Sequence, residues 1–321
     1  SRTAEIFCHL TSHLNQEGMG MKKALSLEQT VNRFLLCVAV WIFLQSIITP
    51  RLTALAPMLS ALYVPVLQLT RLVSFLIPLR LFLGKPPKGA EIRRPAPSKG
   101  TFTGWLLMGL GIYLLIHLLL EVSGLNALTG QSFRRTVSEP IAAYAWFFLF
   151  AVLWEEVAFR RYFCGYLVRY DPQLAVLVSS VVFAMLHGDL VRSAHSFVFG
   201  LLTGYLYLTT GRFLCPYLLH FFANLFWNFY FTPYHTLFPG RPYDLCALAV
   251  LSVGLIALPI LISAYAGRNR PDLSMLTQCQ QALRHMALEK AKFRAALTTP
   301  GMALAYTIFL LFGVQYSFYL L

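Results

Sequence analysis

Charged residues are scarce in this sequence of 321 residues. Asp, Glu, Lys and Arg make up 12% of the chain, hydrophobic residues make up 57%, and the mean hydropathy is +0.62. An average soluble domain carries roughly 25% charged residues, so the charges present cannot cover the surface of a soluble chain of this length. We therefore exclude a soluble enzyme and expect an integral, multi-pass membrane protein, an all-α polytopic bundle of membrane helices.

Regular repeats and paired cysteines are also lacking. The sequence has no glycine period, no long heptad run and no polar low-complexity tract, which excludes collagen-like, coiled-coil and disordered classes. Its six cysteines stand singly, without a C-x-x-C pair, and we interpret them as small buried hydrophobic residues rather than a zinc or disulfide framework. The lack of an internal repeat argues against an inverted-repeat transporter.

Basic residues outnumber acidic ones, 26 against 13. In a membrane protein such residues collect in cytoplasmic loops, where they set the orientation and meet anionic lipid. With the N-terminus in the cytoplasm, most lysines and arginines outside the apolar runs fall on the cytoplasmic side. The expected partner of this charge is therefore the lipid bilayer and not nucleic acid.

Apolar runs predict about nine membrane helices, since a span needs about 20 mainly apolar residues. The second run holds Arg71 and Arg80, so we expect it to be tilted or broken, and Asp171-Pro172 predicts a helix start. We predict eight or nine spans, with the helices at about 31–49, 55–83, 102–124, 141–165, 173–190, 195–210, 213–231, 243–266 and 301–321.

The chain divides into four parts on this pattern. Residues 1–20 form a polar leader that we expect to be disordered. Residues 21–139 hold the first helices and a basic cytoplasmic loop at 84–101, and residues 140–231 form the core with the candidate site. Residues 232–321 add C-terminal helices and a basic cytoplasmic segment, 267–300, whose helical patterning predicts a position along the membrane surface.

Two adjacent acids lie in the fourth apolar run. A charged side chain inside a bilayer costs several kcal/mol, so such residues are functional candidates. Glu156 and Arg160 are spaced i,i+4 and can pair on one helix face. Glu155 points about 100° away from them and is the candidate for an acid or base that transfers a proton. A purely structural ion-pair role for both acids is the open alternative.

Three further polar side chains lie in later apolar runs. His187 closes the run 176–186, and His220 and Asn224 share one helix face through i,i+4 spacing, a stripe that Asn228 continues. Hydrogen bonding between helices, worth about 1 kcal/mol in membranes, is the alternative reading of these side chains.

Lower-ranking features receive structural interpretations. Gly200-x-x-x-Gly204 predicts a seam of close helix packing. We expect His117 and Glu121 to form an interfacial pair, and His195 and His235 to lie in loops.

Together the polar residues form three motifs on separate predicted helices. Glu155-Glu156-x-x-x-Arg160 is followed by Phe183-x-x-x-His187 about thirty residues later and by His220-x-x-x-Asn224 about thirty residues further on. This pattern resembles the CPBP (Abi) family of intramembrane proteases, which includes the type II CAAX prenyl endopeptidases. The resemblance covers roughly residues 140–231, and the distances between motifs are similar to those of the compact prokaryotic members.

The resemblance implies a peptidase of the glutamate type. Glu155 and His187 would activate a water that attacks the scissile carbonyl, and His220 and Asn224 would donate hydrogen bonds to the oxyanion. Glu156 and Arg160 would hold the catalytic side chains in position without reacting themselves. The expected substrate is a membrane-associated peptide or protein terminus, and the expected location is the bacterial inner (plasma) membrane.

Alternatives remain open at this point. We expect no cofactor, but Glu155, His187 and His220 could instead form a zinc site with water as the fourth ligand, as in a metallopeptidase. A proton-coupled transporter that uses the buried Glu and His residues is a second function. A non-catalytic membrane scaffold or immunity protein is a third.

Overall fold

The computed structural model describes residues 25–59, 62–85, 99–123, 141–188, 190–226, 245–265 and 284–318. Within these ranges the secondary structure is helical and includes no strand, in agreement with the predicted all-α class. The leader 1–20, most of the loop 84–101 and the first part of the segment 267–300 lie outside the described residues. The helices are α2 (Leu27–Ala54), α3 (Ala56–Leu59), α4 (Tyr63–Phe82), α5 (Lys99–Val122), α6 (Ile141–Glu156), the π-helix η3 (Val157–Cys164), α7 (Gly165–Leu167), α8 (Pro172–Met185), α9 (Leu190–Thr210), α10 (Leu214–Phe226), α12 (Leu245–Tyr265), α14 (Lys290–Leu297) and α15 (Pro300–Phe318).

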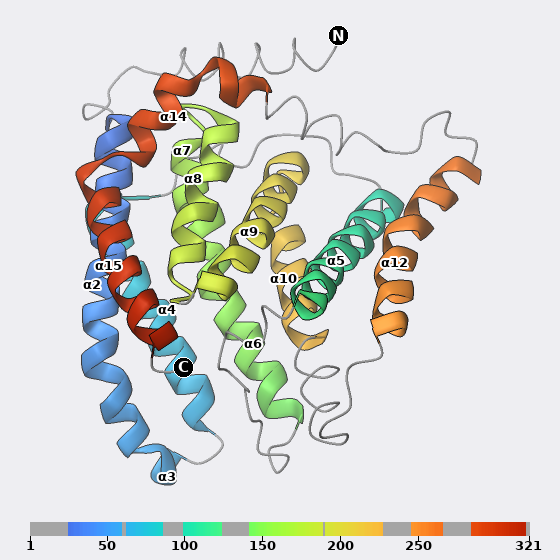
Figure 1. The fold of residues 1–321 in the computed structure, drawn as a ribbon. Helices are drawn as coiled ribbons and strands as arrows, with labels where there is room; N and C mark the ends of the chain where they lie inside the picture. The colour runs from blue at the N-terminus through green and yellow to red at the C-terminus, as the bar shows by residue number, and fades with distance from the viewer. Residues whose placement is uncertain are drawn as a thin grey trace.

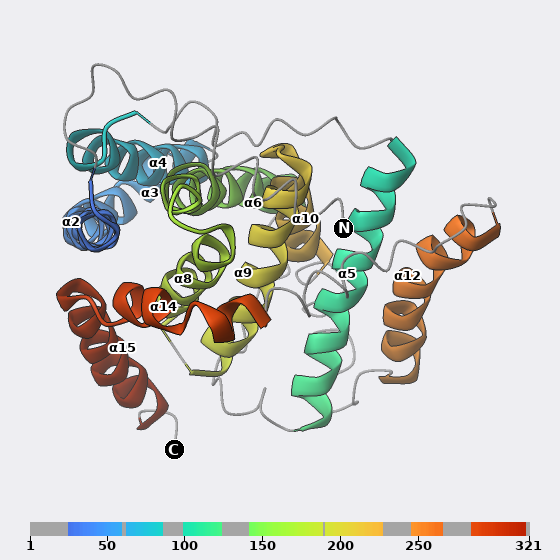
Figure 2. The same cartoon turned by 90° about the horizontal axis from the view of Figure 1, so that it is seen from above.

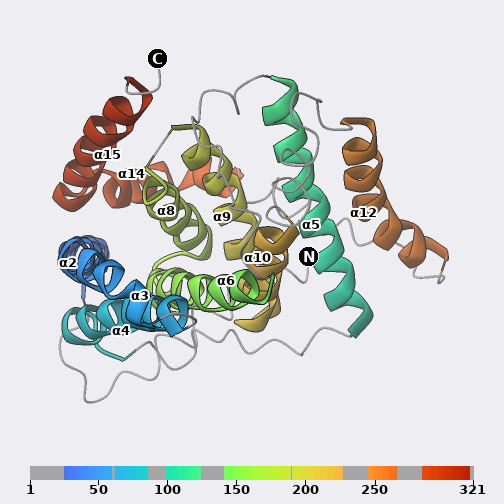
Figure 3. The same cartoon turned by 90° about the horizontal axis from the view of Figure 1, so that it is seen from below.

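The helices form a bundle whose centre is made by the middle of the chain. Figure 1 shows α2, α4 and α15 on one side, α5 and α12 on the other, and α6, α8, α9 and α10 between them. The view from above and the view from below give the same order (Figures 2 and 3). Because α6 packs against α4 and α10, and α9 packs against α8 and α10, the predicted core segment is enclosed by the terminal helices.

The first helix begins at a strong sequence signal. Ser26 and Gln29 form a reciprocal capping box at the start of α2, with Gln29 N donating to Ser26 Oγ at 3.1 Å. Farther along, the buried ring of Phe34 stacks on Phe163 of η3, with ring centroids 3.8 Å apart and nearly parallel planes. Helix α2 is thereby fixed against the central helices.

A π-helix directly follows the two adjacent acids. Helix α6 ends at Glu156, and the next eight residues form the wider turns of η3. Segments of π-helix are rare, are usually single-turn insertions, and are found frequently at functional sites. The sequence pattern predicted one continuous helix over 141–165, so this change of winding is a finding of the structure.

The start of α8 joins three parts of the chain. Asp171 caps the helix by accepting a hydrogen bond from Leu174 N at 2.9 Å, and Pro172 occupies the first position, as predicted. The second carboxylate oxygen of Asp171 lies 2.5 Å from His285 Nε2, in the residues before α14. Tyr170 Oη also donates to the carbonyl of Leu25. The basic segment and the start of α2 therefore meet at one end of the bundle.

The predicted glycine seam is confirmed. A Cβ added at Gly200 would lie 3.0 Å from Ser180 Cβ, and one added at Gly204 would lie 3.2 Å from Val176 Cγ1. These distances are tighter than ordinary contacts, so the two glycines allow α9 to approach α8 closely.

The predicted count of eight or nine membrane helices is not confirmed by the residues that the structure describes. Among the residues that the structure describes, α2, α4 and Phe102–Leu120 within α5 are long and apolar enough to cross a membrane. A fourth candidate is Lys290–Leu297 with Pro300–Leu311, which are bent by 62°. The second predicted run holds α3 and α4, and α4 continues without a break through Arg71 and Arg80, while α8, α10 and α12 provide shorter apolar helices.

Substitution of Gly200 by leucine is expected to destabilise the bundle. The added side chain would be forced into Ser180 on α8, and overpacking of this kind costs about 1–3 kcal/mol. The measurement is the midpoint of thermal unfolding in detergent. Gly254→Leu is the matched control, because a Cβ at Gly254 meets no atom within 4 Å. Equal unfolding midpoints for the two variants would contradict close packing of α9 against α8 at Gly200.

Candidate active site

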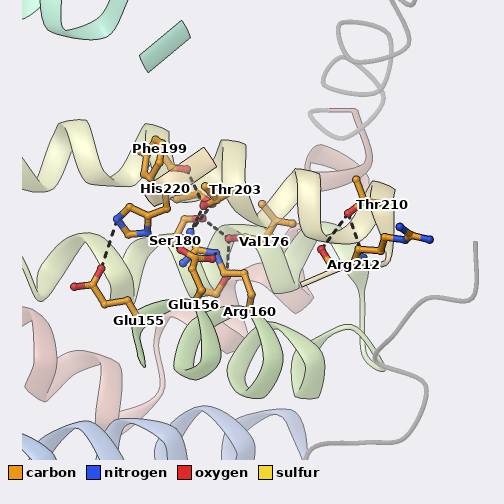
Figure 4. Close-up of polar contacts among 12 residues, drawn as sticks. Glu155, Glu156, Arg160, Val176, Ser180, Phe199, Thr203, Thr210, Arg212 and His220 are labelled. Carbon is orange, nitrogen blue, oxygen red and sulfur yellow. Dashed lines mark hydrogen bonds and ion pairs between the residues drawn. The ribbon is translucent and has the colours of Figure 1, made fainter. Parts of the chain in front are cut away.

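A buried ion pair joins the end of α6 to η3. Arg160 Nε lies 3.2 Å from Glu156 Oε2, and both side chains are sealed from solvent, at 1% and 0% exposure. This confirms the i,i+4 pairing predicted from the sequence. Arg160 also donates to Thr203 Oγ1 on α9 and, at 3.5 Å, to the carbonyl of Gly200 (Figure 4). The guanidinium thus connects η3 to the face of α9 that carries the glycine seam.

His220 on α10 is held by the same carboxylate. Its Nδ1 lies 2.8 Å from Glu156 Oε1, and its ring is buried. An ionised carboxylate only accepts hydrogen bonds, so Nδ1 carries the proton of this contact. The ring of Phe199 packs edge-on against His220, with centroids 5.0 Å apart. The orientation of the imidazole is therefore fixed on two sides.

The second ring nitrogen of His220, Nε2, faces Glu155. His220 Nε2 and Glu155 Oε2 are 3.6 Å apart, and the Glu155 side chain keeps 21% of its surface exposed while Glu156 keeps none. In Figure 4 a dashed line joins Glu155 to the His220 ring, and Glu156 lies beside Arg160. The adjacent carboxylates therefore differ in access: Glu156 is enclosed by its partners, and Glu155 is reachable.

The second motif reaches the site through Phe183. His187 follows the end of α8, where Gly188 adopts a φ of +80° and lets the chain turn away. His187 Nδ1 lies 3.0 Å from the carbonyl oxygen of Phe183. The Phe183 ring contacts both imidazoles, with centroids 4.9 Å from His187 and 5.9 Å from His220. The two histidines therefore share one packing partner.

Asn224 lies one turn after His220 on α10 and is half-buried. The predicted shared face of these two residues follows from the continuous helix between them. Asn228, which would extend this stripe, lies outside the described residues.

His195 was misplaced by sequence reasoning. His195 lies within α9, not in a loop, and its ring contacts His117 at 4.2 Å between centroids. His117 is 7% exposed and packs on Tyr113. The Glu121 side chain lies outside the described part of the chain, so the predicted pairing of His117 with Glu121 stays a prediction. His235 lies outside the described residues.

The zinc alternative requires three ligands in one place. In the described ranges no group of three or more His, Cys, Asp or Glu side chains is close enough to hold a metal ion. The zinc site of Glu155, His187 and His220 therefore stays a prediction.

The fold and the site together define a membrane-embedded helical bundle with buried acid and imidazole groups. Residues 137–226 match the family model of the type II CAAX prenyl endopeptidase Rce1-like proteins. The match begins just before α6, ends with α10 and contains all three motifs, which confirms the resemblance found in the sequence. No curated protein and no solved structure gives a significant match to the chain.

Replacement of Arg160 by glutamine is expected to destabilise the protein strongly. The change leaves the carboxylate of Glu156 buried without its cation, and loss of one partner of a buried pair costs about 3–5 kcal/mol. The measurement is thermal unfolding in detergent. Arg161→Gln, which makes the same change at the next, exposed position, is expected to unfold near the wild-type midpoint. Similar losses in both variants would contradict a special role for the buried pair.

Proposed function

We propose that the protein is an intramembrane endopeptidase in which Glu155, His187, His220 and Asn224 carry the reaction. The observation that carries the proposal is the chain of contacts from Glu155 through His220 and Glu156 to Arg160. It lies within the segment that matches the endopeptidase family. Such a chain gives one partly exposed acid beside one oriented imidazole, which is what general acid–base hydrolysis requires.

In this mechanism Glu155 acts on the attacking water. Its carboxylate, the more exposed of the two, accepts a proton while the water oxygen forms a bond to the scissile carbonyl carbon. His187 assists from the end of α8 by binding the same water. Collapse of the tetrahedral intermediate breaks the C–N bond, and the proton held by Glu155 passes to the leaving amine.

His220 and Asn224 supply the oxyanion hole. To donate to the oxyanion, His220 needs a proton on Nε2, and since Nδ1 already donates to Glu156, the ring then carries both protons. The Asn224 amide, one turn away, supplies the second donor. Each such donor is worth about 2.7–4 kcal/mol in the transition state.

Glu156 and Arg160 keep the imidazole in place. Glu156 binds both His220 and Arg160, and Arg160 in turn binds α9, so a shift of His220 would break a buried ion pair. No step of this mechanism passes through a metal ion.

The substrate we propose is a membrane-associated peptide or protein terminus. The site lies among apolar helices in the centre of the bundle, so the scissile bond must arrive from the bilayer or its surface. The proposed setting is the bacterial inner membrane, with the basic segment that contacts Asp171 on the cytoplasmic side.

The Glu155→Gln variant tests the proposal. We expect cleavage of fluorogenic membrane peptides to fall by at least about a hundredfold, because general acid–base catalysis contributes 10²–10⁴-fold. Glu28→Gln, the same change at an exposed position in the first turn of α2, is the matched control and is expected to retain full activity.

Wild type is assayed in parallel with and without a strong zinc chelator. Full activity of Glu155→Gln would contradict the role given to this acid. Loss of wild-type cleavage in the presence of the chelator would contradict the metal-free mechanism. Failure of the wild-type protein to cleave any peptide of the panel would contradict the proposed peptidase activity.

A further inference from the structure

The residues just before α15 lie across one end of the bundle. Figure 1 shows α14 at the end where α2 and α8 begin, and α14 packs against both of these helices. We call residues 284–297 the α14 segment. Helix α2 is long and apolar enough to cross a membrane and begins at Leu27. The α14 segment therefore lies at the level of the lipid headgroups, where the membrane helices begin.

One face of the α14 segment is attached to the protein. His285 Nε2 lies 2.5 Å from Asp171 Oδ2, the acid that caps α8. Lys292 Nζ lies 3.9 Å from the same oxygen and 3.3 Å from Glu289 Oε2, and the ring of Phe293 is buried. The charges on this inner face are thus compensated by partners within the protein.

The opposite face of the α14 segment is exposed and basic. Arg284, Lys290 and Arg294 are all exposed, and Lys290 and Arg294 lie one helical turn apart. Among the residues that the structure describes, these three cations have no acidic partner within ion-pair distance. Leu288 lies on the same face and is 84% exposed. This outer face therefore combines uncompensated positive charge with an unburied apolar side chain.

The orientation of the outer face is set by the turn into α15. Helices α14 and α15 are bent by 62° relative to each other. Just after the turn, Gly301 N donates to Asn32 Oδ1 on α2 at 2.9 Å. A Cβ added at Gly301 would lie 2.6 Å from that oxygen, so only glycine allows so close an approach. The bend is thereby fixed against α2, and the outer face has one direction relative to the membrane helices.

An anionic lipid surface fits both properties of the outer face. Helices that lie in the membrane interface present lysine and arginine to anionic headgroups and place leucine at the boundary of the acyl chains. A soluble anion could pair with the cations but would leave Leu288 in water. A zwitterionic lipid could cover Leu288 but would attract the three cations less strongly.

We propose that the outer face of the α14 segment is a binding site for the headgroups of anionic phospholipids. Arg284, Lys290 and Arg294 bind the headgroup phosphates, and Leu288 enters the acyl-chain boundary. The site lies outside the segment that matches the endopeptidase family and does not depend on the proposed function. The sequence predicts only a position along the membrane surface, and the contacts with Asp171 determine which side chains face the lipid.

The binding test follows the thermal unfolding midpoint of the full chain in an uncharged detergent while phosphatidylglycerol is added. A ligand that binds the folded state raises this midpoint. We expect phosphatidylglycerol to raise it and phosphatidylcholine to leave it unchanged. The double variant Lys290→Gln/Arg294→Gln is expected to lower the apparent affinity for phosphatidylglycerol about thirtyfold, since each cation near an anionic surface contributes about fivefold.

Arg51→Gln is the matched control, because Arg51 is exposed in the last turn of α2, at the other end of that helix. It is expected to keep the wild-type affinity. An equal loss in Arg51→Gln and in Lys290→Gln would reveal a general charge effect and overturn the site. So would an equal rise of the midpoint with inorganic phosphate, or no rise with phosphatidylglycerol. Without lipid, the double variant is expected to unfold at the wild-type midpoint, and a lower midpoint would show that these cations bind the protein itself.

A second measurement tests where Leu288 lies. Leu288→Trp is placed in vesicles of phosphatidylcholine and phosphatidylglycerol, with and without bromine on the acyl chains of the phosphatidylglycerol. The tryptophan emission of the wild-type protein is subtracted. We expect the added emission to be quenched by the brominated lipid, because an interfacial side chain at this position meets the acyl chains. Unquenched emission from the new tryptophan would overturn the inference.

Discussion

Compensation of the buried charge on Glu156 is the constraint on which the rest of the site depends. Its carboxylate is fully sealed, and it binds Arg160 in η3 and His220 on α10 at the same time. Arg160 in turn binds Thr203 on α9. Removal of either main partner would leave a charge in an apolar interior, which is far more costly than the pair is stabilising. Helices α6, α9 and α10 are therefore held in one relative position, and that position sets where Glu155 meets the imidazole.

The change from α-helix to π-helix at this point has a mechanical consequence. In a regular α-helix adjacent residues point about 100° apart, and here the two acids lie on the last residues before the wider turns of η3 begin. Glu156 is directed into its partners on η3 and α10, while Glu155 remains partly exposed beside His220. One sequence motif thus supplies one fully enclosed acid and one partly exposed acid. The difference comes from the surrounding helices and not from the acids themselves.

Features determined by local spacing could be predicted from the sequence, and features determined by tertiary contacts could not. The Glu156–Arg160 pair and the start of α8 follow from i,i+4 spacing and from capping chemistry, and both are confirmed. The approach of α9 to α8 was also predictable, because small residues four apart permit it. Nothing in the sequence linked Arg160 to Thr203, or His117 to His195, because these partners come from other helices. The π-helix was missed because hydrophobic periodicity over a few turns does not distinguish it from an α-helix.

Phe183 explains how three motifs that are far apart in sequence converge. The Cζ atom of Arg160, in the first motif, lies 4.8 Å from the centroid of the Phe183 ring. The same ring also contacts His187 of its own motif and His220 of the third motif. The four-residue spacing also places the Phe183 carbonyl where His187 Nδ1 meets it. A cation over an aromatic face is favourable in a dry interior, and edge contacts between rings fix their relative tilt. The phenylalanine of the second motif is therefore the packing element that links His187, which follows the end of the short helix α8, to Arg160 and His220.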